Sequence, residues 1–174
     1  MSARAFAVFM GVLAIVGLLA YGVVSKGEAR IQVGEPFPEI ELAKLDGAGA
    51  GSIADYEGQW VLVNLWASWC GPCKAESPDL QRFHEEHGGD GFTVLGVDTK
   101  EVSDDGREFV EKYGLTYPQL HEASDDLSRE LGVTGLPESF LVDPEGNVAL
   151  VVPGPVDETL LAEQVEPLIV KGSS

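Results

Sequence analysis

The sequence predicts one α/β domain behind an N-terminal membrane helix, and three observations lead to this prediction. Residues 5–24 form an uncharged apolar segment. From Glu35 onward, short apolar runs alternate with helical patterns, which is typical of an α/β protein. Hydrophobic residues make up 44% of the 174 residues, so most of the chain should fold around a core. The length fits about one domain.

The chain is strongly acidic, with a formal net charge of −18. Binding to nucleic acid or to anionic lipid requires clustered Lys and Arg, so we exclude both as electrostatic partners. We interpret the acidity as a solvated surface. Two cysteines are too few for a disulfide scaffold or for a zinc site made of cysteines alone.

Ala5 to Val24 is the predicted membrane helix, because 20 uncharged residues at 1.5 Å each match a bilayer core of about 30 Å. A cleaved signal peptide is the alternative. Its apolar region is usually about 7–15 residues and ends at a small-x-small site, whereas the one candidate here begins with Leu18. We expect residues 1–24 to be an uncleaved anchor, residues 25–34 a tether, and residues 35–174 a domain outside the cytoplasm, facing the periplasm or the extracytoplasmic space.

The first half of the domain is predicted to contain three strands and one long helix. Phe37–Leu45 is an extra strand ahead of the core and is followed by a glycine-rich turn. Trp60–Trp66 is nearly continuously apolar, as expected for a central strand that is buried on both faces. A helix should run from about Cys70 to His87, and Phe92–Val97 should form the next buried strand.

The second half is predicted to contain three helices and a β-hairpin. In order, these are a helix from Ser103 to Tyr113, a helix from Ser124 to Leu131, hairpin strands Ser139–Val142 and Val148–Val152 around the turn 143–146, and a helix from Asp157 to about Val165. Serine can cap each of the first two helices at its start. Pro167 should end the last helix.

Cys70 and Cys73 are three positions apart where the predicted central strand gives way to the long helix. Cys70 would lie at the helix N-terminus, where free N–H groups and the helix dipole lower a thiol pKa from about 8.5 to about 7 or below. Cys73, deeper in the helix, would attack a mixed disulfide formed at Cys70. A structural disulfide over so short a loop would stabilise little, and a zinc site would need two further ligands. The spacing therefore predicts a redox-active pair.

Residues 63–74, Val-Asn-Leu-Trp-Ala-Ser-Trp-Cys-Gly-Pro-Cys-Lys, resemble the active-site block of the thioredoxin superfamily. The resemblance covers residues 35–170 and implies a thioredoxin-like fold, with a central mixed sheet flanked by helices. It also implies that Pro78 lies within the first long helix. Finally, it implies a cis peptide bond before Pro137, which would face the cysteines and leave the backbone of Leu136 free to pair with an extended client segment.

Residues next to the cysteines complete the expected client-binding surface: Trp69, Gly71 and Pro72. Trp69 abuts Cys70, so we expect an exposed indole that contacts clients. Trp66 alternates into the strand and should be a core residue. The histidines are expected at ordinary surface positions without a role: His84, His87 and His121.

The anchor, the extra strand and residues 132–143 resemble the membrane-tethered DsbE/CcmG and ResA/TlpA-type branch of this superfamily. This resemblance implies a thiol-disulfide oxidoreductase that reduces apocytochrome c, or its maturation partner, in cytochrome c biogenesis. Its electrons would come from a membrane donor of the DsbD/CcdA type. No cofactor beyond the Cys70–Cys73 disulfide and no metal is expected.

The proton acceptor for Cys73 is open between two glutamates. Cytoplasmic-type thioredoxins have a buried Asp six residues before the first cysteine, but this chain has Asn64, which cannot titrate. Glu76, three residues after Cys73, resembles the acidic residue of the ResA-type branch, and Glu138 beside Pro137 is the second candidate. Burial would raise the pKa of either carboxyl group. The alternative is that Glu76 is only an exposed helix residue.

Three other functions are weighed against a cytochrome c reductant. A TlpA-type reductase would serve other clients, such as copper-site assembly factors. A peroxidase shares the opening Glu35-Pro36-Phe37, but its nucleophile lies in a Pro-x-x-x-Thr-x-x-Cys context that is missing here. A copper chaperone on this fold has cysteines four apart and a distal histidine, whereas no histidine follows His121.

Overall fold

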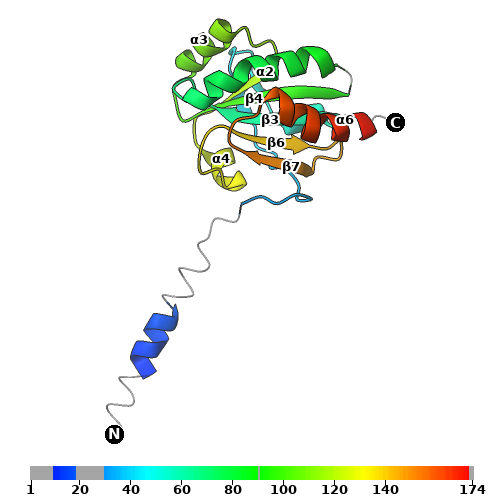
Figure 1. The fold of residues 1–174 in the computed structure, drawn as a ribbon. Coiled ribbons are helices and arrows are strands. Elements are labelled where there is room, and N and C mark those ends of the chain that lie inside the picture. The colour runs from blue at the N-terminus through cyan, green and yellow to red at the C-terminus, as the bar shows by residue number, and fades with distance from the viewer. Residues whose placement is uncertain (1–9, 19–29, 90, 173–174) are drawn as a thin grey trace, which may run out of the picture.

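The computed structural model describes residues 10–18, 30–89 and 91–172. A seven-stranded sheet in the order β2-β1-β5-β4-β3-β6-β7 forms its centre (Figure 1). The strands are β1 Leu42–Lys44, β2 Ala50–Gly51, β3 Trp60–Trp66, β4 Phe92–Thr99, β5 Gln119–Glu122, β6 Glu138–Val142 and β7 Val148–Pro153. β3 pairs with β4, and β4 with β5, in parallel, while the other pairs are antiparallel. The predicted mixed sheet is confirmed.

Helices cover both faces of this sheet (Figure 1). They are η1 Ile53–Tyr56, α2 Gly71–His87, α3 Ser103–Tyr113, α4 Asp126–Leu131, α5 Glu158–Leu160, the π-helical turn η2 Leu161–Val165 and α6 Glu166–Gly172. Leu62 and Trp66 of β3 pack in a core with α2, α3 and α6. Val63 and Leu65 pack in a second core with α4 and the N-terminal segment. The continuous apolar run of β3 therefore supplies both faces, as predicted.

β5 has no counterpart among the predicted elements. Its four residues, Gln119 to Glu122, include Leu120 as the one aliphatic side chain, so neither an apolar run nor clear alternation marks the strand. Its pairing with β4 and β1 is what defines it. The extra strand predicted over Phe37–Leu45 is a strand only over Leu42–Lys44. Ahead of it, Pro36 forms an isolated bridge with Asn147, and Pro38 lacks the N–H group that a continuous ladder would require.

The extents of α3 and α4 agree closely with prediction, but their predicted serine caps are wrong. Ser103 is already the first helical residue of α3, so Val102 occupies the cap position and makes no side-chain bond. Asp125, at the cap of α4, has a left-handed backbone with φ 57° and also makes no cap bond. The left-handed residue Asp125 thus stands between Ser124 and the helix, and the Ser124 hydroxyl donates to the Asp126 carboxylate and not to a helix N–H.

The C-terminal helix continues past Pro167, so the predicted end there is wrong. Residues 161–165 are wound as a π-helix, and the N–H of Glu166 donates to the carbonyl of Leu161, five residues earlier. Pro167 is then the second residue of α6. The π-helical turn interrupts the regular i→i−4 bonding just ahead of Pro167, so a residue without an N–H can be accommodated while the helix continues.

The predicted membrane anchor lies mostly outside the described residues, and only residues 10–18 of it are seen, as a helix. Within the described ranges, no helix has both the length and the apolar character needed to cross a membrane. Of the predicted tether, residues 30–34 are described, and they pack against the domain. The Ile31 N–H donates to the Leu131 carbonyl at 3.2 Å, and the Gly34 N–H donates to the Val148 carbonyl at 2.8 Å.

Candidate active site

Cys70 follows the end of β3 and occupies the N-cap of α2. A disulfide joins it to Cys73, with the two Cα atoms 5.3 Å apart. The Cys73 N–H donates to Cys70 Sγ at 3.2 Å. This is the first-turn geometry expected from the sequence: a backbone donor and the positive end of the helix dipole both face the Cys70 sulfur, where they stabilise negative charge.

The surface around the disulfide combines exposed and buried side chains. Gly71 and Pro72 are exposed, and the Trp69 side chain stands out with 58% of the residue exposed. Cys70 is 4% exposed and Cys73 1%, so the disulfide itself is nearly covered. Trp66 is the core residue predicted, because it is 2% exposed and stacks on Phe109 with ring centroids 4.5 Å apart.

Glu76 is buried on the same helix as the cysteines and is 2% exposed, so its interpretation as an exposed helix residue is wrong. Its Oε1 accepts a hydrogen bond from Asn64 Nδ2 at 2.9 Å, and its Oε2 accepts one from the Val156 N–H at 2.9 Å. Burial raises the pKa of Glu76 to about 7, against the opposing effect of these two hydrogen bonds. At neutral pH this carboxyl group can therefore both hold and release a proton.

Asn64 connects Glu76 to the neighbouring strand. Its side-chain amide donates to Glu76 and also to Ser139 Oγ at 3.0 Å. Asn64 and Ser139 are paired residues of β3 and β6. The amide thus fixes the orientation of the Glu76 carboxyl group without adding a second negative charge.

Glu138 is also buried, but on the other face of the sheet. It is paired with Leu65, one position away from the Asn64–Ser139 pair, and side chains of successive strand residues point to opposite faces. Its carboxylate forms an ion pair with Arg30. Burial raises the pKa of Glu138, while Arg30 acts in the opposite direction. The structure therefore brings Glu76, and not Glu138, onto the face that holds α2 and the cysteines.

The loop before β6 contains the cis peptide bond that the resemblance implies, between Leu136 and Pro137. Leu136 packs against the core that contains both cysteines. The Pro137 carbonyl accepts from the Gly154 N–H at 3.0 Å, whereas no backbone hydrogen bond within the described part of the chain involves Leu136. The Leu136 backbone is therefore available to an extended segment of another protein.

The predictions missed a second buried polar group near the active-site loop. Asp98, 0% exposed, lies beside His121, whose Nδ1 is 2.7 Å from Asp98 Oδ2. The prediction that His121 is an ordinary surface residue is wrong, because 13% of its side chain is exposed. His84 is also partly buried, and burial lowers its pKa. The signal in the sequence was an acid, Asp98, directly after the run Phe92–Val97 that was predicted to be a buried strand.

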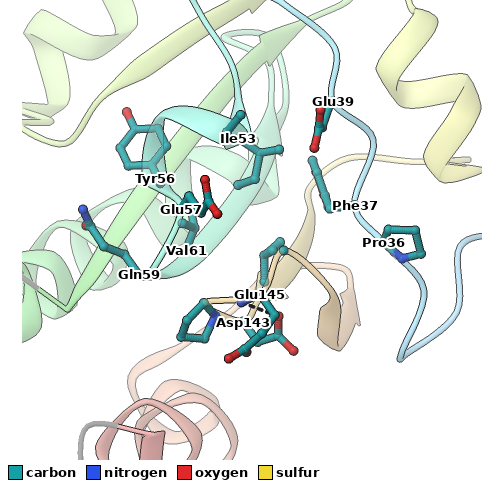
Figure 2. Close-up of a pocket in the computed structure, with 14 residues that line it drawn as sticks. Pro36, Phe37, Glu39, Ile53, Tyr56, Glu57, Gln59, Val61, Asp143 and Glu145 are labelled. Atoms are coloured by element: carbon teal, nitrogen blue, oxygen red, sulfur yellow. Dashed lines mark hydrogen bonds between the residues drawn. The ribbon is translucent and has the colours of Figure 1, made fainter.

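A cavity of about 210 Å³ lies at the opposite end of the central strand (Figure 2). Val61, at the start of β3, lines it, whereas Cys70 follows the end of β3. Four of its lining residues are acidic: Glu39, Glu57, Asp143 and Glu145. Nowhere in the described ranges do three or more His, Cys, Asp or Glu side chains gather as metal ligands would.

A thioredoxin-like sheet that presents two cysteines at the start of a helix defines a thiol-disulfide oxidoreductase, and the comparisons with known proteins agree. The chain belongs to the AhpC/TSA family, whose model matches residues 33–151. It is 33% identical over 164 residues to the thiol:disulfide interchange protein DsbE of Allochromatium vinosum, covering 91% of this chain and 88% of that protein. It is 29% identical over 154 residues to the thiol-disulfide oxidoreductase ResA of Geobacillus thermodenitrificans, covering 88% of each.

The fold has a solved counterpart in a DsbE-type thiol:disulfide interchange protein from Chlorobium tepidum. The two structures superpose with a TM-score of 0.74 at 26% identity, covering 83% of this chain and 99% of that one. The chain is therefore a thiol-disulfide oxidoreductase of the DsbE/ResA type, and its clients are proteins that carry thiols.

Proposed function

We propose that this chain is a membrane-tethered, extracytoplasmic reductant of apocytochrome c or of a protein that matures it. The observation that carries the proposal is the Cys70–Cys73 disulfide at the start of α2, with the buried Glu76 on the same helix. The Cys70–Cys73 pair alone carries the electrons, as the dithiol, without a further cofactor. Similarity to DsbE-type proteins and the cis-proline loop beside Glu138 support the choice of client.

The reaction transfers two electrons from the reduced cysteine pair to a client disulfide. The Cys70 thiolate attacks one client sulfur, the client S–S bond breaks, and a Cys70–client mixed disulfide forms while the other client sulfur leaves as a thiolate and takes a proton. Cys73 then loses its proton and attacks Cys70 Sγ. The Cys70–Cys73 disulfide forms, and the client leaves with both of its sulfurs reduced. A membrane thiol donor of the DsbD/CcdA type restores the dithiol by the reverse sequence.

Glu76 is the group we assign to take the Cys73 proton. Cys73 and Glu76 are three residues apart on α2, so they lie on one side of the helix, and both are buried. An acceptor works best when its pKa is near the ambient pH, and the Glu76 pKa of about 7 meets this condition. Glu138, on the other face of the sheet, contributes to the cis-proline loop instead.

The client-binding surface combines the exposed side chain of Trp69 with the free backbone of Leu136. An extended client segment can pair with that backbone as an added strand. Gly71 and Pro72 are exposed between the cysteines, and the absence of bulky side chains there leaves room for the client backbone. A large aromatic beside the nucleophile supplies apolar contact area.

The proposed function is tested with two oxidised peptides. One carries the two haem-binding cysteines and the following histidine of an apocytochrome c, and the other carries the cysteine pair of a copper-site assembly factor. Reduced protein should reduce the first at least tenfold faster than the second. Equal rates, or a preference for the second peptide, would instead support a general TlpA-type reductase.

The reduction potential of the Cys70–Cys73 couple should be low. Gly71 and Pro72 between the cysteines resemble reducing members of the superfamily, so we expect a value nearer thioredoxin's (about −270 mV) than that of the oxidant DsbA (about −120 mV). Equilibration with glutathione redox buffers, followed by mass spectrometry of trapped thiols, measures it. A value above about −180 mV would indicate an oxidase or isomerase.

Residues 30–174 should fold and exchange disulfides without the proposed anchor, residues 1–24, but should fail to support client reduction in cells. The active-site elements all follow Arg30, and Arg30 itself pairs with Glu138, so the fragment begins there. The anchor would add confinement to the membrane, which raises the encounter rate with membrane-bound donors and clients. The fragment is expressed with a cleavable secretion signal at matched abundance. Full rescue, or release of the wild-type protein from membranes, would contradict the anchor assignment.

A further inference from the structure

Two consecutive residues ahead of the nucleophile are tied to two consecutive residues that follow β4. Both carboxylate oxygens of Glu101 bind Ser68: Oε1 accepts from the Ser68 N–H at 2.7 Å, and Oε2 accepts from the Ser68 hydroxyl at 2.5 Å. The Trp69 indole N–H donates to the Lys100 carbonyl at 3.4 Å. The segment between β3 and Cys70 is therefore held from the side by the β4–α3 connection.

The backbone that presents Glu101 is unusual. Lys100 has a left-handed conformation with φ 62°, which a residue with a Cβ adopts only where its surroundings impose it. This turn directs Lys100 outward and places its carbonyl against Trp69 and the next side chain against Ser68. Left-handed backbone at a non-glycine residue is commonly found at functional sites.

Asp98, near the end of β4, is a buried acid that can hold a proton. Its Oδ2 contacts His121, whereas its Oδ1 is buried and has no donor among the described residues. Gly106 of α3 packs so close that a Cβ there would come within 2.4 Å of Oδ2. Burial first, and then the nearby Glu101 and Asp105, raise the pKa of Asp98 to about 9. Asp98 is therefore protonated at neutral pH and can donate a hydrogen bond to Glu101.

Asp98 lies on the same side of the sheet as the cysteines. Asp98 is paired with Trp66 on one side and with His121 on the other in the parallel ladders, and Trp66 faces the core that contains both cysteines. The titratable groups around Asp98 are Glu101, Asp105 and His121. The mechanism above uses none of them.

We propose that Glu101 is a positioning residue of the active site: supported by the Asp98–His121 pair, it fixes Ser68 and Trp69 so that Cys70 meets the first turn of α2. The inference rests on thiol-disulfide exchange at Cys70 and not on the identity of the client. A loosened loop weakens the contact between the Cys73 N–H and Cys70 Sγ, so the Cys70 thiolate loses a donor.

Glu101→Gln is the first test, because the amide is uncharged and keeps only one of the two carboxylate oxygens. Both charge-assisted bonds to Ser68 are therefore weakened, and the contact with the hydroxyl can remain only if Ser68 Oγ accepts from the amide. Positioning predicts that the pKa of the Cys70 thiol rises, with about a threefold smaller thiolate fraction at pH 7, and that kcat/KM for client reduction falls about tenfold. Ser68→Ala should also raise the Cys70 pKa and lower kcat/KM. The double variant should show no larger change in either quantity than Glu101→Gln alone. Glu130→Gln makes the same charge change at an exposed position on α4 and should leave both quantities unchanged.

The direction in which the pKa of the Cys70 thiol changes separates this proposal from its alternatives. A purely electrostatic role predicts a lower Cys70 pKa in Glu101→Gln, because a negative charge is removed. A purely structural role predicts a lower melting temperature with an unchanged Cys70 pKa. Either result would overturn the proposal.

The support from Asp98 is tested in the disulfide form, in which neither cysteine titrates. Tryptophan fluorescence of the wild type should change with a midpoint near pH 9 as Asp98 ionises beside Trp66. Asp98→Asn keeps a donor for Glu101 at every pH, so it should lack this transition while its client reduction at pH 7 stays within twofold of the wild type. The same transition in both proteins, or loss of activity in Asp98→Asn, would remove Asp98 from the proposal.

Discussion

Cys70→Ser should abolish client reduction, with loss of activity beyond a thousandfold. Cys70 is the sulfur that receives the first-turn N–H of α2, so it is the thiol whose anion the fold stabilises. A serine hydroxyl is not ionised at neutral pH and cannot form the mixed disulfide. Single-turnover reduction of a client disulfide by the pre-reduced protein, followed by mass spectrometry of trapped thiols, measures this loss.

Cys73→Ser should have a different outcome, in which attack by Cys70 still occurs but resolution does not. The mixed disulfide should therefore accumulate and be visible as a covalent adduct on a non-reducing gel. Cys70 is the N-cap of α2, between the exposed residues Trp69 and Gly71, whereas Cys73 lies within the helix, so we expect a client sulfur to reach Cys70 first. Adducts formed by Cys70→Ser, and none by Cys73→Ser, would show that the two roles are reversed.

The sequence was sufficient to predict where the disulfide lies because local patterns determine it. Trp60–Trp66 is apolar except for Asn64, which indicates a strand buried on both faces, and Pro72 is compatible with the first turn of a helix. These two features place Cys70 at a helix N-terminus without any knowledge of distant residues. The cis bond before Pro137 was a different matter: it was implied by resemblance and not by any local pattern.

The environment of Glu76 could not be predicted in the same way. Whether this residue is buried depends on the loop after β7, where the Val156 N–H binds it, 80 residues away in the sequence. The contacts of Asp98 and Glu101 likewise depend on β5 and on the bend at Lys100. β5 carries no apolar pattern of its own and was not predicted. The pairing of Asp98 with His121 of β5 could therefore not be predicted either.

The N-terminal segment shows the same dependence on tertiary contacts. Arg30 reads as part of a polar tether, yet it pairs with Glu138, 108 residues away. Gly132 permits this approach, because a Cβ at this position would lie 2.7 Å from the Arg30 Cα. The segment that would lead from the membrane is thus attached to the strand that follows the cis proline, on the face opposite to Glu76.

Glu76→Gln is expected to slow release of the client from the mixed disulfide by roughly a hundredfold at pH 7.5, within the range that a general base contributes. A glutamine is the same size and can still accept one of the two hydrogen bonds, but it cannot accept the Cys73 proton. Binding of the client to Cys70 should change little, so kcat should fall while formation of the mixed disulfide keeps its rate. The pH profile of reduction should also lose one ionisation near pH 7.

Two further variants make this result interpretable. Glu86→Gln changes an exposed acid on the same helix and should behave as the wild type. Glu138→Gln tests the other candidate: if it slows resolution and Glu76→Gln does not, Glu138 is the proton acceptor despite its position on the opposite face. Unchanged titration of both cysteines in Glu76→Gln would show that Glu76 has a structural role only.

The same residue should make the stability of the oxidised protein depend on pH. The Glu76 pKa is raised from 4.5 to about 7 on folding, so between these values the folded chain holds a proton that the unfolded chain has lost. The stabilisation is complete below about pH 4.5. It falls by about 1.4 kcal/mol per pH unit as the pH rises from there through about 7, a loss of about 3 kcal/mol in total. Glu76→Gln removes this contribution, because an amide does not titrate.

Urea unfolding of the disulfide form of wild type and Glu76→Gln from pH 5 to pH 8 should therefore show stabilities that cross. At pH 5 the variant should be less stable than the wild type by about 1 kcal/mol, since one hydrogen bond to Asn64 or Val156 is lost. By pH 8 the wild type must hold a charged carboxylate in the core, so the order should reverse. A constant difference between the two proteins over this range would mean that the Glu76 pKa is not raised in the folded state, and Glu76 would then be a poor acceptor for the Cys73 proton at neutral pH.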